Sequence, residues 1–168
     1  SLFEYSREAA TIYNLPDKES ADGIVILGTS LFADSEDDTR DRFLRSFAAM
    51  PMVQIGEPTD LCPWIWVDPA PGIESAVQHL VEEHGYSRFG LVSGPMEGSE
   101  SRVRTDIFVR ALESRNLFLD QKHRDEGLFT EDSGIAAVDR LYDKGGLDVE
   151  ALFIENDEMA VGAINRLQ

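Results

Sequence analysis

The sequence predicts an α/β fold built on mostly parallel β-sheet. Three observations support this class: short apolar runs rich in branched residues, amphipathic helical segments between them, and the regular alternation of the two along 168 residues. Apolar runs bounded by Gly, Pro or Ser are typical of buried parallel strands. Strands that alternate with helices form parallel sheets with right-handed crossovers. A hydrophobic content of 42% is sufficient for a packed core of this kind.

The expected elements follow one another without repeats. The strands are expected at residues 23–27, 52–55, 88–92 and 151–154. The helices are expected at residues 37–49, 73–83, 101–114 and 134–142, where apolar side chains recur at helical spacing. The last strand continues directly into Asn156-Asp157, which begins a further helix through residue 167. Asn and Asp cap helices with their side-chain oxygens, and open α/β sheets bind ligands at the carboxyl ends of their strands.

One irregular stretch interrupts the alternation. Residues 56–72 contain four prolines around a short apolar run at residues 64–67. Prolines at this density do not continue a helix or a central strand, so this stretch is a candidate for the connection between two parts of the chain. The expected parts are residues 1–67 and 68–168. A long surface loop is the alternative interpretation.

Charge and cysteine content limit the function classes. The net charge of −17 makes this part of the protein repel phosphate backbones, so it is not expected to touch DNA itself. The single cysteine, Cys62, has no internal disulfide partner, which favours a reducing compartment. We find neither a secretory leader nor an apolar run that could span a membrane after Ser1, and therefore predict a cytoplasmic protein without a membrane partner.

The sequence lacks the common motifs of catalytic and metal-binding sites. The sequence has no phosphate-binding Gly-x-x-x-x-Gly-Lys loop, no Gly-x-Ser-x-Gly elbow and no His-Glu-x-x-His helix. His79, His84 and His123 are scattered, and an isolated helical histidine is more often a packed or surface residue than a ligand. The acidic residues 34–38 fit a solvated helix start better than a calcium loop. We expect no enzyme, no cofactor and no metal.

The junction at residues 156–162 reads Asn-Asp-Glu-Met-Ala-Val-Gly. It resembles the Asn-Asp-x-Met-Ala-x-Gly signature of the lac repressor/purine repressor family of ligand-responsive transcription regulators. Other segments resemble the family in the same order, at residues 21–26, 51–55, 85–95, 104–112 and 127–134. The most specific of them are the strand that ends Ser-Gly-Pro at residues 93–95 and the Gly-x-Phe-x-x-x-Ser-Gly pattern that begins at Gly127. The resemblance extends over roughly residues 21–168.

The resemblance implies an architecture and a mode of action. The implied fold is α/β, periplasmic-binding-protein-like type I, with parallel sheets flanked by helices in two lobes and incomplete at both ends. Residues 1–67 would form part of the N-terminal lobe of the effector domain and residues 68–168 part of the C-terminal lobe. The lobes would close on a small-molecule effector, a sugar or related metabolite. Regulators of this family act as homodimers that reach DNA through a helix-turn-helix domain, which these residues lack.

The family pattern also points to five ligand-binding residues. Arg104 stands where the family has an effector-contacting arginine, although an exposed helix arginine is the usual role of this residue type. Phe129, expected after a strand, matches an aromatic ring that stacks on the ligand, with core packing as the alternative. Asn156 offers a donor and an acceptor, and Asp157 is expected to support it as the helix cap. Asp68 falls at the crossing between lobes, but the following Pro69 replaces the family's Asn.

Two further classes share this fold. A solute-binding protein of a sugar transport system would have the same cleft, with a secretory leader upstream in place of a helix-turn-helix. A sensor domain of a signalling protein would differ in the sequence that follows the effector domain.

Overall fold

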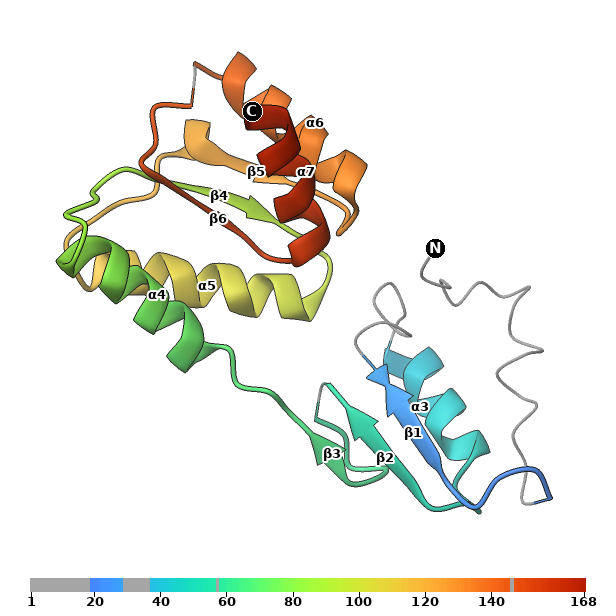
Figure 1. The fold of residues 1–168 in the computed structure, drawn as a ribbon. Helices are drawn as coiled ribbons and strands as arrows, with labels where there is room; N and C mark the ends of the chain where they lie inside the picture. The colour runs from blue at the N-terminus through green and yellow to red at the C-terminus, as the bar shows by residue number, and fades with distance from the viewer. Residues whose placement is uncertain (1–18, 29–36, 57, 146) are drawn as a thin grey trace. The chain divides into compact units, whose positions relative to one another are not determined.

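The chain divides into two compact units, Ser1–Asp68 (unit 1) and Pro69–Gln168 (unit 2). The computed structural model describes residues 19–28, 37–56, 58–145 and 147–168. Each unit contains a parallel sheet, with helix α3 beside that of unit 1 and helices on both faces of that of unit 2, as the ribbon shows (Figure 1). The predicted α/β class with parallel sheets is therefore confirmed.

Unit 1 contains a three-stranded parallel sheet. Its described elements are β1 (Ile24–Leu27), α3 (Asp37–Ser46), β2 (Met52–Ile55) and β3 (Trp64–Ile65), with strand order β1-β2-β3. Register pairs Ile24 with Met52 and Gln54 with Trp64. The core lies between the sheet and α3 and contains Ile26, Phe43, Leu44, Phe47 and Met50. The predicted strands at 23–27 and 52–55 agree with β1 and β2.

The proline-rich stretch at residues 56–72 includes a short strand and the start of a helix. Trp64 and Ile65 form the short edge strand β3, and Gly56 donates its N–H to the Ile65 carbonyl at 2.9 Å. An edge position accommodates flanking prolines because only one side of the strand takes part in the ladder. Helix α4 begins at Ala70, before the predicted start, since Pro71 in the first turn does not need an intrahelical N–H partner.

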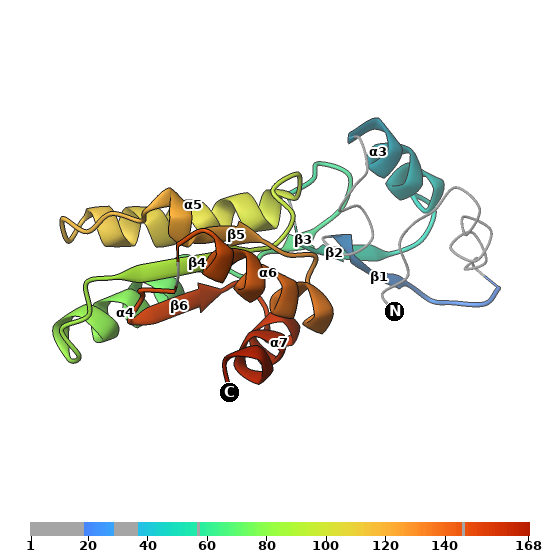
Figure 2. The same cartoon turned by 90° about the horizontal axis from the view of Figure 1, so that it is seen from above.

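Unit 2 has three layers. It comprises α4 (Ala70–Glu82), β4 (Phe89–Ser93), α5 (Ser99–Glu113), the 3-10 turn η1 (Gln121–His123), β5 (Arg124–Glu126), α6 (Glu131–Asp143), β6 (Ala151–Ile154) and α7 (Asp157–Leu167). The strands are parallel in the order β5-β4-β6, and Figure 2 shows β4 between its two neighbours. Helices α4 and α5 cover one face of the sheet, and α6 and α7 cover the other (Figure 1).

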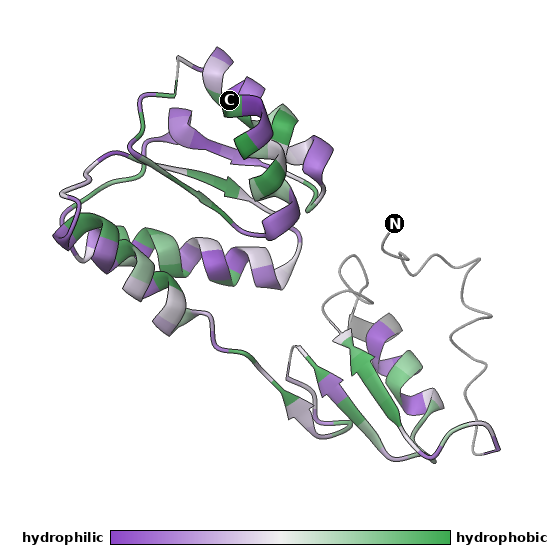
Figure 3. Cartoon of the chain, in the orientation of Figure 1, coloured by the Kyte–Doolittle hydropathy of each residue, from purple (hydrophilic) through white to green (hydrophobic). Residues whose placement is uncertain are grey.

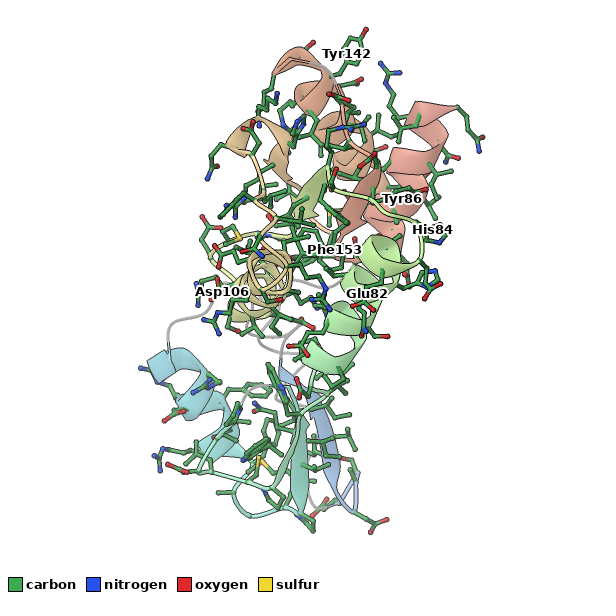
Figure 4. The ribbon with its side chains drawn as sticks, turned by 90° about the vertical axis from the view of Figure 1, so that its left-hand side faces the viewer. Glu82, His84, Tyr86, Asp106, Tyr142 and Phe153 are labelled. Carbon is green, nitrogen blue, oxygen red and sulfur yellow. The ribbon has the colours of Figure 1, made fainter. Side chains whose placement is uncertain are left out.

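Successive side chains along each strand point to opposite faces of this sheet and pack against the helices on that face. Phe89 and Leu91 of β4 join the cluster with α4 and α5, whereas Val92 joins the cluster with α6 and α7. Phe153 of β6 stacks on Phe108 of α5 with ring centroids 4.5 Å apart, and Figure 4 shows it against α5. Burial on both sides is why these strands read as continuous apolar runs in the sequence.

Strand β5 is the exception. Its sequence is Arg-Asp-Glu, and the hydropathy colouring of Figure 3 shows it hydrophilic beside the apolar β4 and β6. Pairing with β4, through Leu91 with Arg124 and Val92 with Asp125, gives it strand geometry. This strand was therefore not among those predicted from apolar runs in the sequence.

Helices α6 and α7 approach each other through glycines. A Cβ placed on Gly134 would lie 2.2 Å from the Met159 carbonyl oxygen, and one on Gly162 would lie 2.1 Å from the Glu131 carbonyl oxygen. Both distances are too short for any side chain, so only glycine permits this backbone contact. The Gly134 and Gly162 positions therefore fix the spacing of the two helices.

Candidate functional site

The carboxyl ends of the three strands of unit 2 meet at one edge of its sheet. The Gly127 N–H donates to the Ser93 carbonyl at 2.8 Å, and the Glu155 N–H donates to the Val92 carbonyl at 3.2 Å. These bonds extend the ladder of β4 to both neighbours by one residue. The segments that leave the sheet here begin with Gly94, Gly127 and Glu155, and this is the edge where open α/β sheets place their ligands.

Glu155 is the buried acid of this edge, with 7% of its surface exposed. Its Oε2 accepts the Gly94 N–H at 2.7 Å, and its Oε1 accepts the Thr105 hydroxyl at 2.8 Å. Burial raises the pKa of the Glu155 carboxyl, while these two hydrogen bonds and the nearby Arg104 cation act in the opposite direction. One side chain thereby joins the ends of β4 and β6 to helix α5.

Arg104 extends from α5 to the same edge. Its Nη1 donates to the backbone carbonyl of Glu155 at 3.0 Å, and its Nη2 donates to the carboxylate of Glu100, one turn earlier on the helix. The ion pair compensates much of the guanidinium charge. A guanidinium carries five N–H donors, and these two bonds use one on each terminal nitrogen. The predicted functional arginine is therefore held at the strand ends and is not a freely solvated helix residue.

Phe129 lies where β5 turns into α6. Its backbone has a φ of 59°, the left-handed region that non-glycine residues rarely occupy. Its ring lies against the chain after β4, because a Cβ on Gly94 would be 2.0 Å from a ring carbon. The same ring packs against the buried cluster of Val92 and Met159. Gly94 thus leaves room for an aromatic side chain that is half-buried at the edge.

Asn156 fixes this arrangement from the third strand. Its Nδ2 donates to the Phe129 carbonyl at 2.9 Å, and its Oδ1 accepts the Met159 N–H at 3.1 Å. The second bond caps α7, so the expectation that Asp157 caps this helix is wrong. Asn156 has the extended backbone that a capping position requires, whereas Asp157 is already helical and exposed.

The start of α6 adds a second cap beside Phe129. The Thr130 side chain accepts the Ser133 N–H at 3.3 Å, and Ser133 Oγ in return accepts the Thr130 N–H at 3.2 Å and also the Leu128 N–H at 2.9 Å. Such reciprocal capping satisfies N–H groups that the first turn of a helix leaves unpaired. It holds the backbone on both sides of Phe129, which lets a residue with positive φ persist there.

Three of the five predicted residues come together at this edge, namely Arg104, Phe129 and Asn156. Asp157 is adjacent, in the first turn of α7. Asp68 is the last residue of unit 1, and the site described here is built from unit 2 alone.

Sequence reasoning missed Glu155, Thr105 and Ser101. The sequence contained two indications of these residues. Ser101 and Thr105 share the helical face of Phe108, and all three are buried. Glu155 is an acid placed directly after an apolar strand. Its pairing with Gly94 was not visible in the sequence, since 61 residues separate them.

Across the described ranges, no group of three or more His, Cys, Asp or Glu side chains is arranged to hold a metal ion. In the same ranges, none of the helices has the length and apolarity needed to cross a bilayer.

The chain is similar in sequence to known transcriptional repressors. No family model matches it. The HTH-type transcriptional repressor PurR of Haemophilus influenzae (strain PittEE) is 30% identical over 154 residues, which cover 89% of this chain and 43% of the repressor. The chain therefore spans less than half the length of this relative.

Solved structures show the same fold. The transcriptional regulator CelR in complex with cellobiose matches 96% of this chain and 47% of its own, with a TM-score of 0.72 and 28% identity. A sugar-binding regulator of the LacI family from Escherichia coli, complexed with phosphate, matches 98% of this chain and 57% of its own with a TM-score of 0.73. Its 24% identity supports the fold alone. The periplasmic-binding-protein-like fold is thus confirmed, and the homologues and structural neighbours of this chain are regulators of the lac repressor/purine repressor (LacI) family, in agreement with the resemblance seen in the sequence.

Proposed function

We propose that this chain is part of the effector-binding domain of a transcriptional regulator, and that Arg104, Phe129 and Asn156 contact the effector. The observation that supports this most directly is the convergence of the three side chains at the carboxyl edge of the unit 2 sheet. In this proposal, residues 1–67 and 68–168 are parts of the two lobes of the domain. Ligand-induced closure of the lobes would then be the regulatory output, through a difference in affinity for the open and closed forms.

The chemistry of the edge favours a hydroxyl-rich, uncharged effector such as a sugar. Arg104 has N–H groups beyond the two already engaged, and Asn156 has a second amide N–H, which suit ligand hydroxyl groups. The ring of Phe129 offers an apolar face for a sugar ring. The Glu100 carboxylate already pairs with Arg104, so this cation is not reserved for an anionic ligand.

Asp157 and Asp68 remain proposed ligand contacts on positional grounds. Asp157 is exposed beside Asn156, where its carboxylate can accept from ligand hydroxyl groups. Asp68 marks the end of unit 1.

The proposed partners follow from the family. A homodimer in the cytoplasm would bind DNA through a domain outside these residues, in keeping with a net charge of −17 that disfavours direct contact with phosphates. No catalytic role is proposed. The relatives are transcriptional regulators, which favours this function over a transport solute-binding protein or the sensor of a signalling protein.

Calorimetric titration tests the proposal with sugars, including cellobiose, and with sugar phosphates and purines. We expect saturable binding of an uncharged sugar that Arg104→Ala and Phe129→Ala each weaken about tenfold or more, because each removes a direct contact. Matched controls are Arg110→Ala, on an exposed position of the same helix, and Phe118→Ala, whose side chain is 80% exposed. Binding that all four variants leave unchanged would contradict the site, and binding to none of the compounds would contradict the proposal.

A further inference from the structure

Two of the three histidines meet at the end of α4. His79 lies in the last turn of the helix, and His84 lies in the turn that follows it. The backbone of this turn is fixed, because Gly85 at a φ of 69° donates to the Val81 carbonyl and Tyr86 donates to the Leu80 carbonyl, both at 3.1 Å. Figure 4 shows His84 beside Glu82 and Tyr86 at this helix end. The pair precedes β4, at the opposite end of that strand from the candidate effector site.

The two imidazoles face each other through the same nitrogen. Their Nε2 atoms are 3.1 Å apart, and their ring centroids are 4.8 Å apart with planes at 80°. A straight N–H···N hydrogen bond at this separation would place the centroids about 5.4 Å apart. The centre-to-nitrogen lines of the two rings are therefore inclined to the line that joins the nitrogens.

Two rings inclined to the same side of that line have a common point at a metal-ligand distance. The centre of an imidazole is about 1.15 Å from its nitrogen, so two symmetrically placed rings with these separations have centre-to-nitrogen lines that meet about 2.1 Å beyond each Nε2. Zinc binds histidine nitrogen at about 2.0–2.1 Å. We propose that His79 and His84 form a two-histidine site for a borderline divalent transition metal such as Zn²⁺, Ni²⁺ or Cu²⁺, with water in the remaining positions.

The surroundings favour a cation at this point. Both rings are exposed and accessible to solvent, and the carboxylates of Glu82 and Glu83 lie on the same turn of the chain. The Tyr86 ring lies 5.3 Å from the ring of His84 at a tilt of 31°, which restricts the orientation of that imidazole. The protein supplies two ligands here and imidazole selects transition metals over Mg²⁺ and Ca²⁺, so we expect affinity in the order Cu²⁺ above Ni²⁺ and Zn²⁺.

A metal held in this way would join the end of α4 to the turn before β4. Since the two ligands come together only when this turn is folded, metal binding is linked to folding and raises the stability of unit 2. This consequence is independent of effector binding.

Titration of the full chain without a histidine tag tests the site, using ZnCl₂ with calorimetry and the ring proton resonances of the histidines in NMR spectra. We expect one Zn²⁺ per chain, with shifts in two of the three histidines. His79→Gln and His84→Gln should each weaken binding about tenfold or more, and the double variant should add little to either. Gln78→Ala, a neighbouring exposed position on α4, is the matched control and should bind like the wild type.

Three outcomes would overturn the proposal. The first is no saturable binding of Zn²⁺, and the second is binding that both histidine variants retain. The third is a shift of the His123 resonance in place of the other two. Because both histidines are exposed, the variants are expected to fold, and thermal unfolding without metal checks this.

Discussion

Two acidic side chains on either side of β4 illustrate opposite uses of a carboxylate. Asp125 of β5 has only 6% of its side chain exposed and pairs with Arg140 Nη2 at 2.7 Å and Lys144 Nζ at 2.6 Å. Burial alone would raise the pKa of Asp125, but these two cations hold it below its ordinary value. Glu155, after β6, receives its hydrogen bonds from the neutral Gly94 N–H and Thr105 hydroxyl, and burial keeps its pKa raised.

The two acids differ in their partners, and Glu155 is also the more deeply buried of the two. Asp125 has two cations of its own, so its ionised form stabilises the contact between β5 and α6. Glu155 shares one cation, Arg104, whose other nitrogen already pairs with Glu100. A carboxylate with a shared cation costs more to ionise. Glu155 is thus less fully compensated by cations than Asp125, and a carboxyl with a raised pKa is typical of functional sites.

Removal of Glu155 should have the largest effect. Glu155→Ala leaves the Gly94 N–H and the Thr105 hydroxyl without their partner in a buried place, so we expect a loss of about 3 kcal/mol in the free energy of unfolding. Denaturant unfolding followed by far-UV circular dichroism measures it. The tryptophans at positions 64 and 66 lie in unit 1, so their fluorescence is an internal control. Glu158→Ala, an exposed acid nearby, should change little, and an equal loss there would contradict the role of Glu155.

Neutralisation of Asp125 should have the second largest effect. Asp125→Asn keeps the volume but removes the charge that Arg140 and Lys144 face, and because both cations are about half exposed, solvent screening limits the loss to about 1–2 kcal/mol. The same unfolding experiment applies, with Asp143→Asn on the exposed side of α6 as control. A loss that 1 M salt does not reduce would show that packing, and not charge, accounts for it.

The pH dependence of stability separates the two acids by sign. Glu155 has a raised pKa, so its contribution is present below the ordinary value of 4.5 and is lost as pH rises through the folded-state pKa. Asp125 has a lowered pKa, so its contribution is present above 3.8 and is lost as pH falls. Relative to Glu155→Gln, the wild type should lose stability above pH 4.5. Relative to Asp125→Asn, it should lose stability below pH 3.8. Unfolding midpoints across this range measure both, and slopes of the same sign would refute the comparison.

The smallest effect is expected at Glu150. Its Oε2 accepts the Ser87 and Arg88 N–H groups at 2.8 and 3.0 Å, and these bonds lower its pKa, but the residue lies on the surface. Glu150→Gln should therefore change stability less than either buried acid, and 0.5 M salt should remove most of the difference. A change as large as that of Asp125→Asn would mean that burial does not decide the ranking.

Much of the fold could be predicted because the spacing of apolar residues along the sequence reflects which side chains are buried in strands and helices. The strands at 52–55 and 151–154 have the predicted bounds, and those at 24–27 and 89–93 differ by one residue. Strand β5 could not be predicted in this way, since its Arg-Asp-Glu sequence derives its geometry from β4, Arg140 and Lys144. These partners are distant in sequence. The bounds of α4 were displaced by a proline that the first turn tolerates.

The site was predictable in position but not in its internal bonds. Arg104, Phe129 and Asn156 were predicted from their places in the family pattern, and the structure brings them to one edge. Asp157 was predicted as the cap of α7, but Asn156 caps the helix. Both residue types can cap, and the backbone geometry decides between the two adjacent positions. Glu155 was missed since its partners lie on β4 and α5.

The glycine contacts between α6 and α7 have a consequence for dynamics. With backbone against backbone at Gly134 and Gly162, no side-chain rotamer is available to absorb sliding of one helix along the other. Phe129 and Asn156 stand at the beginnings of these two helices and are joined by a hydrogen bond, so they move as one body. A ligand that touches either residue meets a surface with little conformational entropy left to lose, which favours a slow dissociation rate.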